Sequence, residues 1–183
     1  MKLQVTQDFL YEFLKEHDFN MSRLSEQMGV SLAIVTKCFH HDLNRHGKHL
    51  YFSVANIHRL NMALVELSEQ ILNSRINYGT DQMFTNRLSR TYDPGTVPGI
   101  KMLSKYFNLN NFLFRVLGWK KGKKESVLCS PSSKVYGFIT SDDIMRINAE
   151  LLTIASTFAG VQVVAESGFS AVDSSDNGIP TDN

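Results

Sequence analysis

Residues 20–39 read Asn-Met-Ser-Arg-Leu-Ser-Glu-Gln-Met-Gly-Val-Ser-Leu-Ala-Ile-Val-Thr-Lys-Cys-Phe. Asn20 and Ser22 are residue types that cap helix N-termini, and either would start a short helix here. Gly29 then supplies the left-handed backbone conformation that a sharp turn requires. Ser31 follows as the cap of a second helix. This stretch therefore predicts two short helices joined by a tight corner.

The segments on both sides of this corner also have helical patterns. Upstream, residues 6–17 carry apolar side chains at helical spacing that are predicted to face inward, namely Phe9, Leu10, Phe13 and Leu14. Downstream, Ser53 is placed as the N-cap of a longer helix. The apolar face of that helix is formed by Ile57, Leu60, Leu64, Leu67 and Ile71.

Four residues of the corner resemble a known family. Ser25 is the small residue of the first helix, Gly29 is the corner, Val30 is the apolar residue after it, and Val35 is the β-branched residue of the second helix. Through this pattern, residues 5–72 resemble the helix-turn-helix of the phage-repressor and Cro family, also called lambda-repressor-like or Xre-type. The resemblance implies a mainly α fold, sequence-specific binding of duplex DNA, and a role in transcription regulation.

The second helix of such proteins enters the major groove of DNA, and its N-terminal residues contact base edges. Carried over to this chain, the resemblance implies that the base-contacting residues are Ser31, Leu32, Ala33, Thr36 and Lys37. It implies that Arg23, Arg45 and Lys48 hold phosphates.

The chain also contains an internal repeat. Residues 57–64 and 144–151 share the pattern Ile-x-Arg-(Leu/Ile)-Asn-x-x-Leu, 87 residues apart. The apolar series continues in the second copy at Ile144, Ile147, Leu151, Ile154 and Phe158. The alternative is a chance likeness between two amphipathic helices. The repeat predicts two tandem helix-turn-helix units, residues 1–76 and 77–166, which read two half-sites as a covalent pseudo-dimer or form a homodimer.

Upstream of that helix, a spacing of 79 residues aligns the two copies, with an eight-residue insertion between Trp119 and Phe138. Asn108 then stands where the first copy has Gly29, which is acceptable because asparagine also adopts positive φ. The second recognition helix would expose Asn110, Asn111, Phe112 and Arg115. Asparagine and arginine can form bidentate contacts with adenine and guanine, respectively.

Lysines follow this helix directly, at Lys120, Lys121, Lys123 and Lys124. They are interpreted as a phosphate clamp, and the alternative is a solvated loop. Residues 127–129 and 134–136 predict a small β-hairpin. Residues 76–165 carry eleven Lys and Arg against six Asp and Glu, so the middle of the chain is basic. Residues 167–183 are rich in Ser, Asp and Gly, and they predict an acidic, disordered tail.

The composition narrows the class of protein. The chain of 183 residues is 43% hydrophobic and 20% charged, as in globular proteins. No run approaches the roughly 20 apolar residues of a membrane span, and no signal-peptide pattern opens the sequence, so a cytoplasmic protein without membrane contact is expected.

Neither zinc binding nor catalysis is favoured. Cys38 lies near His40, His41, His46 and His49, but their spacing matches no standard zinc finger, and a buried, core-facing cysteine is favoured. The histidines are expected in a loop beside DNA, where a protonated ring could meet a phosphate. The sequence contains no Gly-rich phosphate loop, nucleophile elbow or His-Glu-x-x-His motif. Asp142 and Asp143 suit the start of a helix. No enzymatic activity, metal or cofactor is expected.

Two other functions stay open. Residues 1–75 carry eight basic and eight acidic residues, which favours an interaction or structural adaptor that reuses the fold without nucleic acid. An accessory factor for recombination or replication of a mobile element is the other alternative.

Overall fold

The computed structural model describes residues 2–76, 99–118, 120–121, 128–129, 141–165 and 171–172. Within these residues the protein is mainly helical, as the sequence predicted. The first copy contains α1 (Gln7–Glu16), α2 (Met21–Met28), α3 (Leu32–Phe39) and α4 (Val54–Asn73). The second copy contains α6 (Ile100–Leu103), α7 (Leu109–Leu117) and α8 (Ser141–Gly160).

The described strands are short and form three pairs. β1 (Leu3–Val5) pairs in parallel with β5 (Val161–Val163), and β2 (Tyr51–Phe52) pairs in parallel with β6 (Ala171–Val172). β3 (Lys120–Lys121) and β4 (Leu128–Cys129) are antiparallel. The β1–β5 pair joins the start of the first copy to the end of the second.

The helices of the first copy begin where the sequence predicted. The side chains of Thr6, Asn20, Ser31 and Ser53 accept hydrogen bonds from backbone amides at the starts of α1, α2, α3 and α4. The predicted apolar faces of α4 and α8 are buried throughout. In α1, Leu10 and Leu14 are buried, but Phe9 is 48% exposed, so its predicted inward position is wrong.

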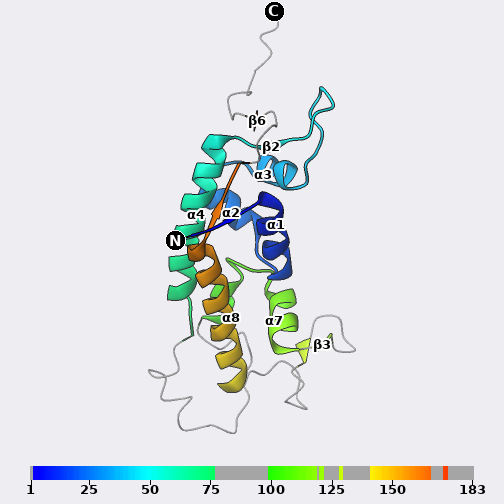
Figure 1. The fold of residues 1–183 in the computed structure, drawn as a ribbon. Helices are drawn as coiled ribbons and strands as arrows, with labels where there is room; N and C mark the ends of the chain where they lie inside the picture. Colours follow the sequence, from blue (N-terminus) through cyan, green and yellow to red (C-terminus); the bar gives the residue numbers. More distant parts are fainter. Residues whose placement is uncertain are drawn as a thin grey trace, which may run out of the picture.

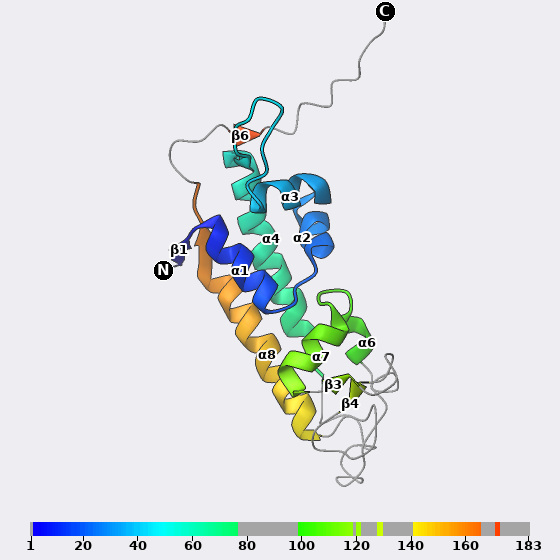
Figure 2. The ribbon, with the colours of Figure 1, turned by 90° about the vertical axis from the view of Figure 1, so that its right-hand side faces the viewer.

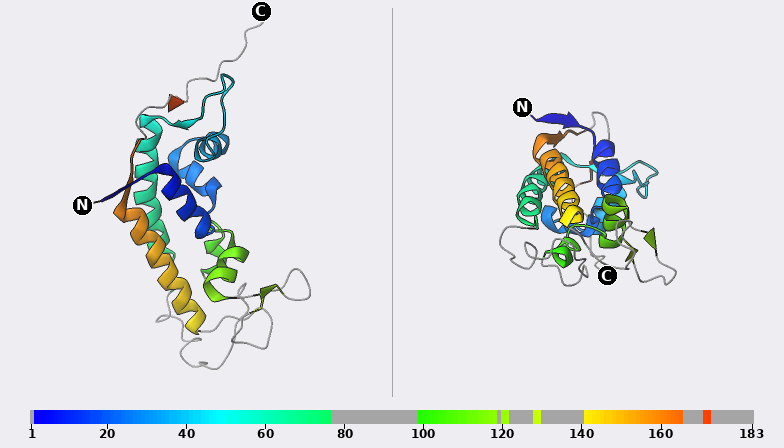
Figure 3. Two further views of the ribbon diagram at one scale, coloured as in Figure 1. Left: turned by 45° about the vertical axis from the view of Figure 1, so that its right-hand side comes forward. Right: turned by 90° about the horizontal axis from the view of Figure 1, so that it is seen from below.

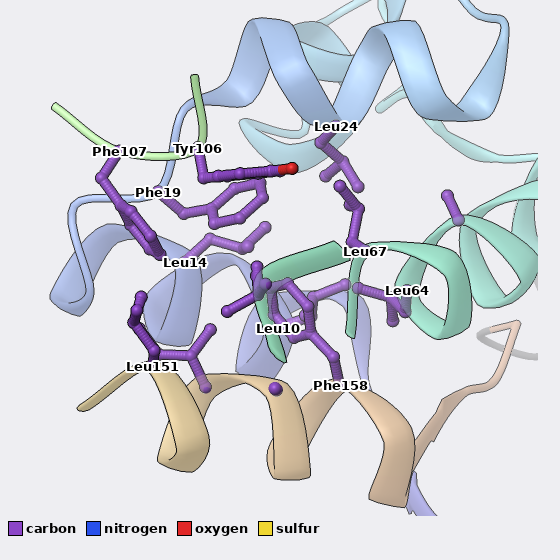
Figure 4. Packing of buried hydrophobic residues seen from close by; sticks show 14 of the residues in the cluster. Leu10, Leu14, Phe19, Leu24, Leu64, Leu67, Tyr106, Phe107, Leu151 and Phe158 are labelled. Carbon is purple, nitrogen blue, oxygen red and sulfur yellow. The ribbon is translucent and has the colours of Figure 1, made fainter. Parts of the chain in front are cut away.

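Helices α4 and α8 form the spine of the molecule (Figure 1). They run in opposite directions and overlap near the middle of the structure, while α1, α2, α3 and α7 lie on one side of them (Figures 1 and 2). Buried apolar residues of both copies form a common cluster. Figure 4 shows Phe19 and Leu64 of the first copy close to Phe107 and Phe158 of the second.

Two asparagines show that the copies are related by an internal twofold axis. Asn61 Nδ2 donates to the Val163 carbonyl at 2.9 Å, and the Val163 amide donates to Asn61 Oδ1 at 2.8 Å. Asn148 Nδ2 donates to the Ile76 carbonyl at 2.7 Å, and the Ile76 amide donates to Asn148 Oδ1 at 2.8 Å. Asn148 lies 87 residues after Asn61, and Val163 lies 87 residues after Ile76. Each copy therefore makes the same contact with the other.

The same relation holds elsewhere in the interface. Ser68 Oγ donates to the carbonyl of Ala155, its own counterpart 87 residues later, at 2.8 Å. Phe19 and Phe107 form an antiparallel bridge at a spacing of 88 residues. The flanking bonds run from the Asn20 amide to Tyr106 and from the Asn108 amide to Asp18. Such reciprocal contacts define an isologous interface, here within one chain.

This symmetry corrects the predicted alignment of the second copy. Asn108 has a φ of −67°, and its side chain accepts from the Asn111 amide, so it is an N-cap like Asn20 and not a corner like Gly29. Gly118, with a φ of 65°, ends α7 as Gly29 ends α2. Helix α7 therefore corresponds to α2 at a spacing of about 88 residues, and the spacing of 79 and the eight-residue insertion are wrong.

Two further predictions, the hairpin and the disordered tail, also change. Leu128 and Cys129 do form a hairpin strand, but their partner is Lys120–Lys121, while residues 134–136 lie outside the described residues. Ala171 and Val172 lie in the predicted disordered tail but pair with β2. An edge strand such as β2 has unpaired backbone groups, and a polar segment can bind them through its own backbone.

Candidate nucleic-acid interface

The corner between α2 and α3 is fixed by backbone hydrogen bonds. The Gly29 amide donates to the Glu26 carbonyl and the Val30 amide to the Ser25 carbonyl, each at 3.1 Å. With Gly29 at a φ of 63°, this is a Schellman motif, which satisfies the last carbonyls of α2. Ser25 is buried where α2 packs on α4 and α3, which explains the small residue predicted there.

Helix α3 turns one face to the core and leaves its start open. Val35, Cys38 and Phe39 are buried, and the ring of Phe39 stacks on Tyr11. Burial raises the pKa of the Cys38 thiol to about 11, as expected for a core position. The predicted base-contacting residues lie on the other face. Ser31, Leu32, Ala33 and Lys37 are exposed, and Thr36 is half-buried.

A basic turn follows α3, formed by residues 43–49 with Arg45 and Lys48 exposed near its tip. Asn44 Oδ1 accepts from the His46 amide at 2.8 Å and the Lys48 amide at 3.0 Å, and Gly47 has a φ of 72°. Leu43 and His49 close the turn as an isolated bridge. The turn therefore has a defined shape, for which the Asn and Gly residues were a sequence signal.

Contacts with α1 hold the base of this turn, and sequence reasoning missed them. Tyr11 Oη lies 2.8 Å from His40 Nε2, and His41 Nε2 lies 2.6 Å from Asp8 Oδ1. His49 Nδ1 lies 2.7 Å from the His41 carbonyl. Tyr11 and Asp8 come from α1, about 30 residues earlier in the chain, so no local pattern could indicate their contacts.

Three exposed or partly exposed cations of the first copy lie at this end of the molecule, on α3 and on the turn after it. Within the described part of the chain, Lys37, Arg45 and Lys48 form no ion pair with a carboxylate. Arg23 differs, and its predicted role in holding phosphate is not supported. Its guanidinium donates to Glu26 at 3.1 Å and Gln70 at 2.6 Å, and it lies 5.8 Å from the centre of the Tyr106 ring.

The residues predicted to contact bases in the second copy lie on α7. Because α7 corresponds to α2, it is not a recognition helix. Phe112 is fully buried and stacks on Phe107, so its predicted contact with a base is wrong. Arg115 is bound to Asp18 at 3.1 Å and Glu150 at 2.5 Å, so it is not free for guanine. Asn110 and Asn111 are exposed at the start of α7.

These ion pairs belong to a junction between the copies. His17 Nδ1 lies 2.6 Å from Glu150 Oε1, the same oxygen that accepts from Arg115. The hydrogen bond with His17, followed by the contacts with Arg115, holds the pKa of Glu150 below its ordinary value, although burial alone would raise it. The junction therefore has a structural role.

The predicted lysine clamp is described only in part. Lys120 and Lys121 form β3, at the opposite end of the molecule from α3 (Figures 1 and 2). Lys123 and Lys124 lie outside the described residues. Because α7 corresponds to α2, the segment after α7 corresponds to α3. This segment begins with the basic strand β3.

Among the described residues, no group of three or more His, Cys, Asp or Glu side chains is arranged to hold a metal ion. No helix in these ranges combines the length and the apolar character needed to cross a membrane. No family model, curated protein or solved structure matches the chain.

Proposed function

We propose that this protein binds duplex DNA in a sequence-specific manner through α2, Gly29 and α3, as a regulator of transcription. Helix α3 enters the major groove, which is about 12 Å wide and admits one helix. Ser31 donates to or accepts from a base edge, and Ala33 contacts a thymine methyl group. Lys37, Arg45 and Lys48 hold phosphates.

The observation that carries this proposal is the exposed start of α3 beside a turn whose Arg45 and Lys48 are exposed and form no ion pair with a described carboxylate. A corner with a Schellman motif and a capping serine holds the first turn of α3 rigidly. The residues that face outward there are small or polar, apart from Leu32, and small side chains let the backbone approach base edges closely. The cationic tip at Arg45 and Lys48 extends this surface, and phosphate contacts of this kind fix a protein's register on DNA.

Three observations favour a protein-interaction adaptor instead. The net charge of residues 1–75 is zero, and Arg23 binds within the protein. Leu32 is also 42% exposed on α3, as in a surface that docks another protein. A measurement of salt-dependent DNA binding therefore distinguishes the DNA-binding protein from the adaptor.

The test is fluorescence anisotropy with a labelled random-sequence duplex, measured from low to physiological salt. We expect binding that weakens steeply with salt. Lys48→Ala is expected to flatten the slope of log K against log salt by about 0.9, the value for one lost phosphate contact. Lys15→Ala is the matched control, because it removes one exposed lysine from α1 and should leave the slope unchanged. Absence of binding at low salt would reject DNA binding and favour the adaptor.

A further inference from the structure

The internal twofold axis places a dimer interface inside one chain. Helices α4 and α8 meet around Ser68 and Ala155, and reciprocal contacts extend to both sides of that point. A protein that reads two half-sites normally obtains its twofold axis from two chains. Here the surfaces around that axis are already buried within the protein, so a second chain is not needed to create it.

The axis relates two elements, each of which follows a glycine in the left-handed conformation. In the first copy, Gly29 is followed by α3, and in the second copy, Gly118 is followed by β3. Figure 3 shows α4 and α8 on one side of the molecule. The turn after α3 and the strand β3 both project from the other side, at opposite ends. Two contact points on one side and at opposite ends suit two separate positions on a duplex.

The two contact points differ in chemistry. The start of α3 carries Ser31, Leu32 and Ala33, which can distinguish bases by hydrogen bonds and apolar contacts. The strand β3 carries Lys120 and Lys121. Lysine is a flexible point charge without the planar fork that recognises guanine in a bidentate way, so it suits phosphate rather than sequence.

We propose that one chain binds one bipartite DNA site as a monomer, with α3 reading the sequence of one half and β3 holding the phosphates of the other. This inference rests on the proposed function. The linkage is covalent, so binding at one half raises the effective concentration of the other contact point at its half. The preferred site therefore has one block of defined sequence, and its second half is set by distance alone.

The experiment selects tight binders from a pool of randomised duplexes with the full-length protein, then maps backbone protection and counts chains per duplex by native mass spectrometry. We expect one chain per duplex, a single sequence block, and a second protected patch about 10 base pairs away, the spacing of one helical turn. The variant Lys120→Ala with Lys121→Ala should lose the second patch, keep the sequence block, and lower the salt slope by about 1.8.

The outcomes separate this inference from the function on which it rests. Two chains on a palindromic sequence would overturn the monomer while preserving DNA binding. One chain with a single protected patch would overturn the second contact point. No binding to any duplex at low salt would reject the proposed function itself. The mapping of the unmodified protein decides between these cases even if the lysine variant is poorly folded.

Discussion

Gly29 is the single residue on which the corner between α2 and α3 depends. A Cβ at this position would meet no atom of the described residues within 4 Å, so space does not limit substitution. Its φ of 63° does, because a left-handed conformation costs a residue with a side chain roughly 1–2 kcal/mol. We therefore expect Gly29→Ala to lower the free energy of unfolding by about that amount, measured by urea denaturation.

Gly160 provides the matched control for that substitution. A Cβ there also meets no described atom within 4 Å, but Gly160 ends α8 without a positive φ. Gly160→Ala should raise the free energy of unfolding by about 0.4–1 kcal/mol, because alanine loses less chain entropy on folding. Equal destabilisation by both substitutions would contradict the assignment of the cost to backbone conformation.

Single residues show where sequence reasoning succeeds and where it fails. The caps Asn20 and Ser31 and the corner Gly29 were predicted because their chemistry acts on neighbouring backbone groups. Phe112 was predicted wrongly because six of the nine residues of α7 are apolar, so the apolar pattern could also be aligned at a spacing of 79. Asn108 and Gly118 were the better signal, since a cap and a left-handed glycine bound α7 as they bound α2.

At the scale of elements, the predictable helices are those with a regular apolar face. Helices α1 and α4 and the end of α8 agree with the predicted stretches, because each buries one face on the common core. The counterpart of α3 was not predictable. The sequence Lys120-Lys121-Gly122 is compatible with a loop or a strand. The partner strand at Leu128–Cys129 is set by tertiary structure.

The spine of α4 and α8 gives a prediction at this scale. Asn61→Ala and Asn148→Ala each remove two hydrogen bonds to the backbone of the segment after the other helix. We expect similar losses of about 1–3 kcal/mol in the free energy of unfolding, the usual range for such a loss in a partly buried place. Chemical denaturation measures both values.

The control for these variants is Asn73→Ala, which changes an exposed asparagine in the last turn of α4 and should have little effect. A large loss for one spine variant with none for the other would mean that the two asparagines do not have equivalent roles. That result would contradict the internal symmetry as a source of stability, whatever the effect on DNA binding.

At the scale of the whole molecule, the two copies are held by contacts that the sequence does not mark. His17 and Asp18 end the first helix of one copy, while Arg115 and Glu150 belong to the other. The repeat indicated that two similar units exist, but it carried no information on how they face each other. Pairing of charges that lie 97 and 133 residues apart depends on the assembled fold.

The junction at Glu150 predicts how stability depends on pH. Because the pKa of Glu150 is lowered in the folded protein, the unfolded chain binds more protons here, and stability rises with pH. The contribution of Glu150 is complete above its unfolded pKa, roughly 4.3 for a free glutamate, and is lost as the pH falls through its lowered folded value. Glu150→Gln removes this contribution while preserving the shape of the side chain.

We therefore expect Glu150→Gln to be less stable than the unmodified protein near pH 7 and the two stability curves to approach each other toward pH 3. Urea denaturation at a series of pH values gives both curves. Glu12→Gln is the control, because Glu12 is 59% exposed in its pair with Lys15 and is screened by solvent. Parallel curves for the Glu150 variant and the unmodified protein would show that the junction does not couple the two copies through this charge.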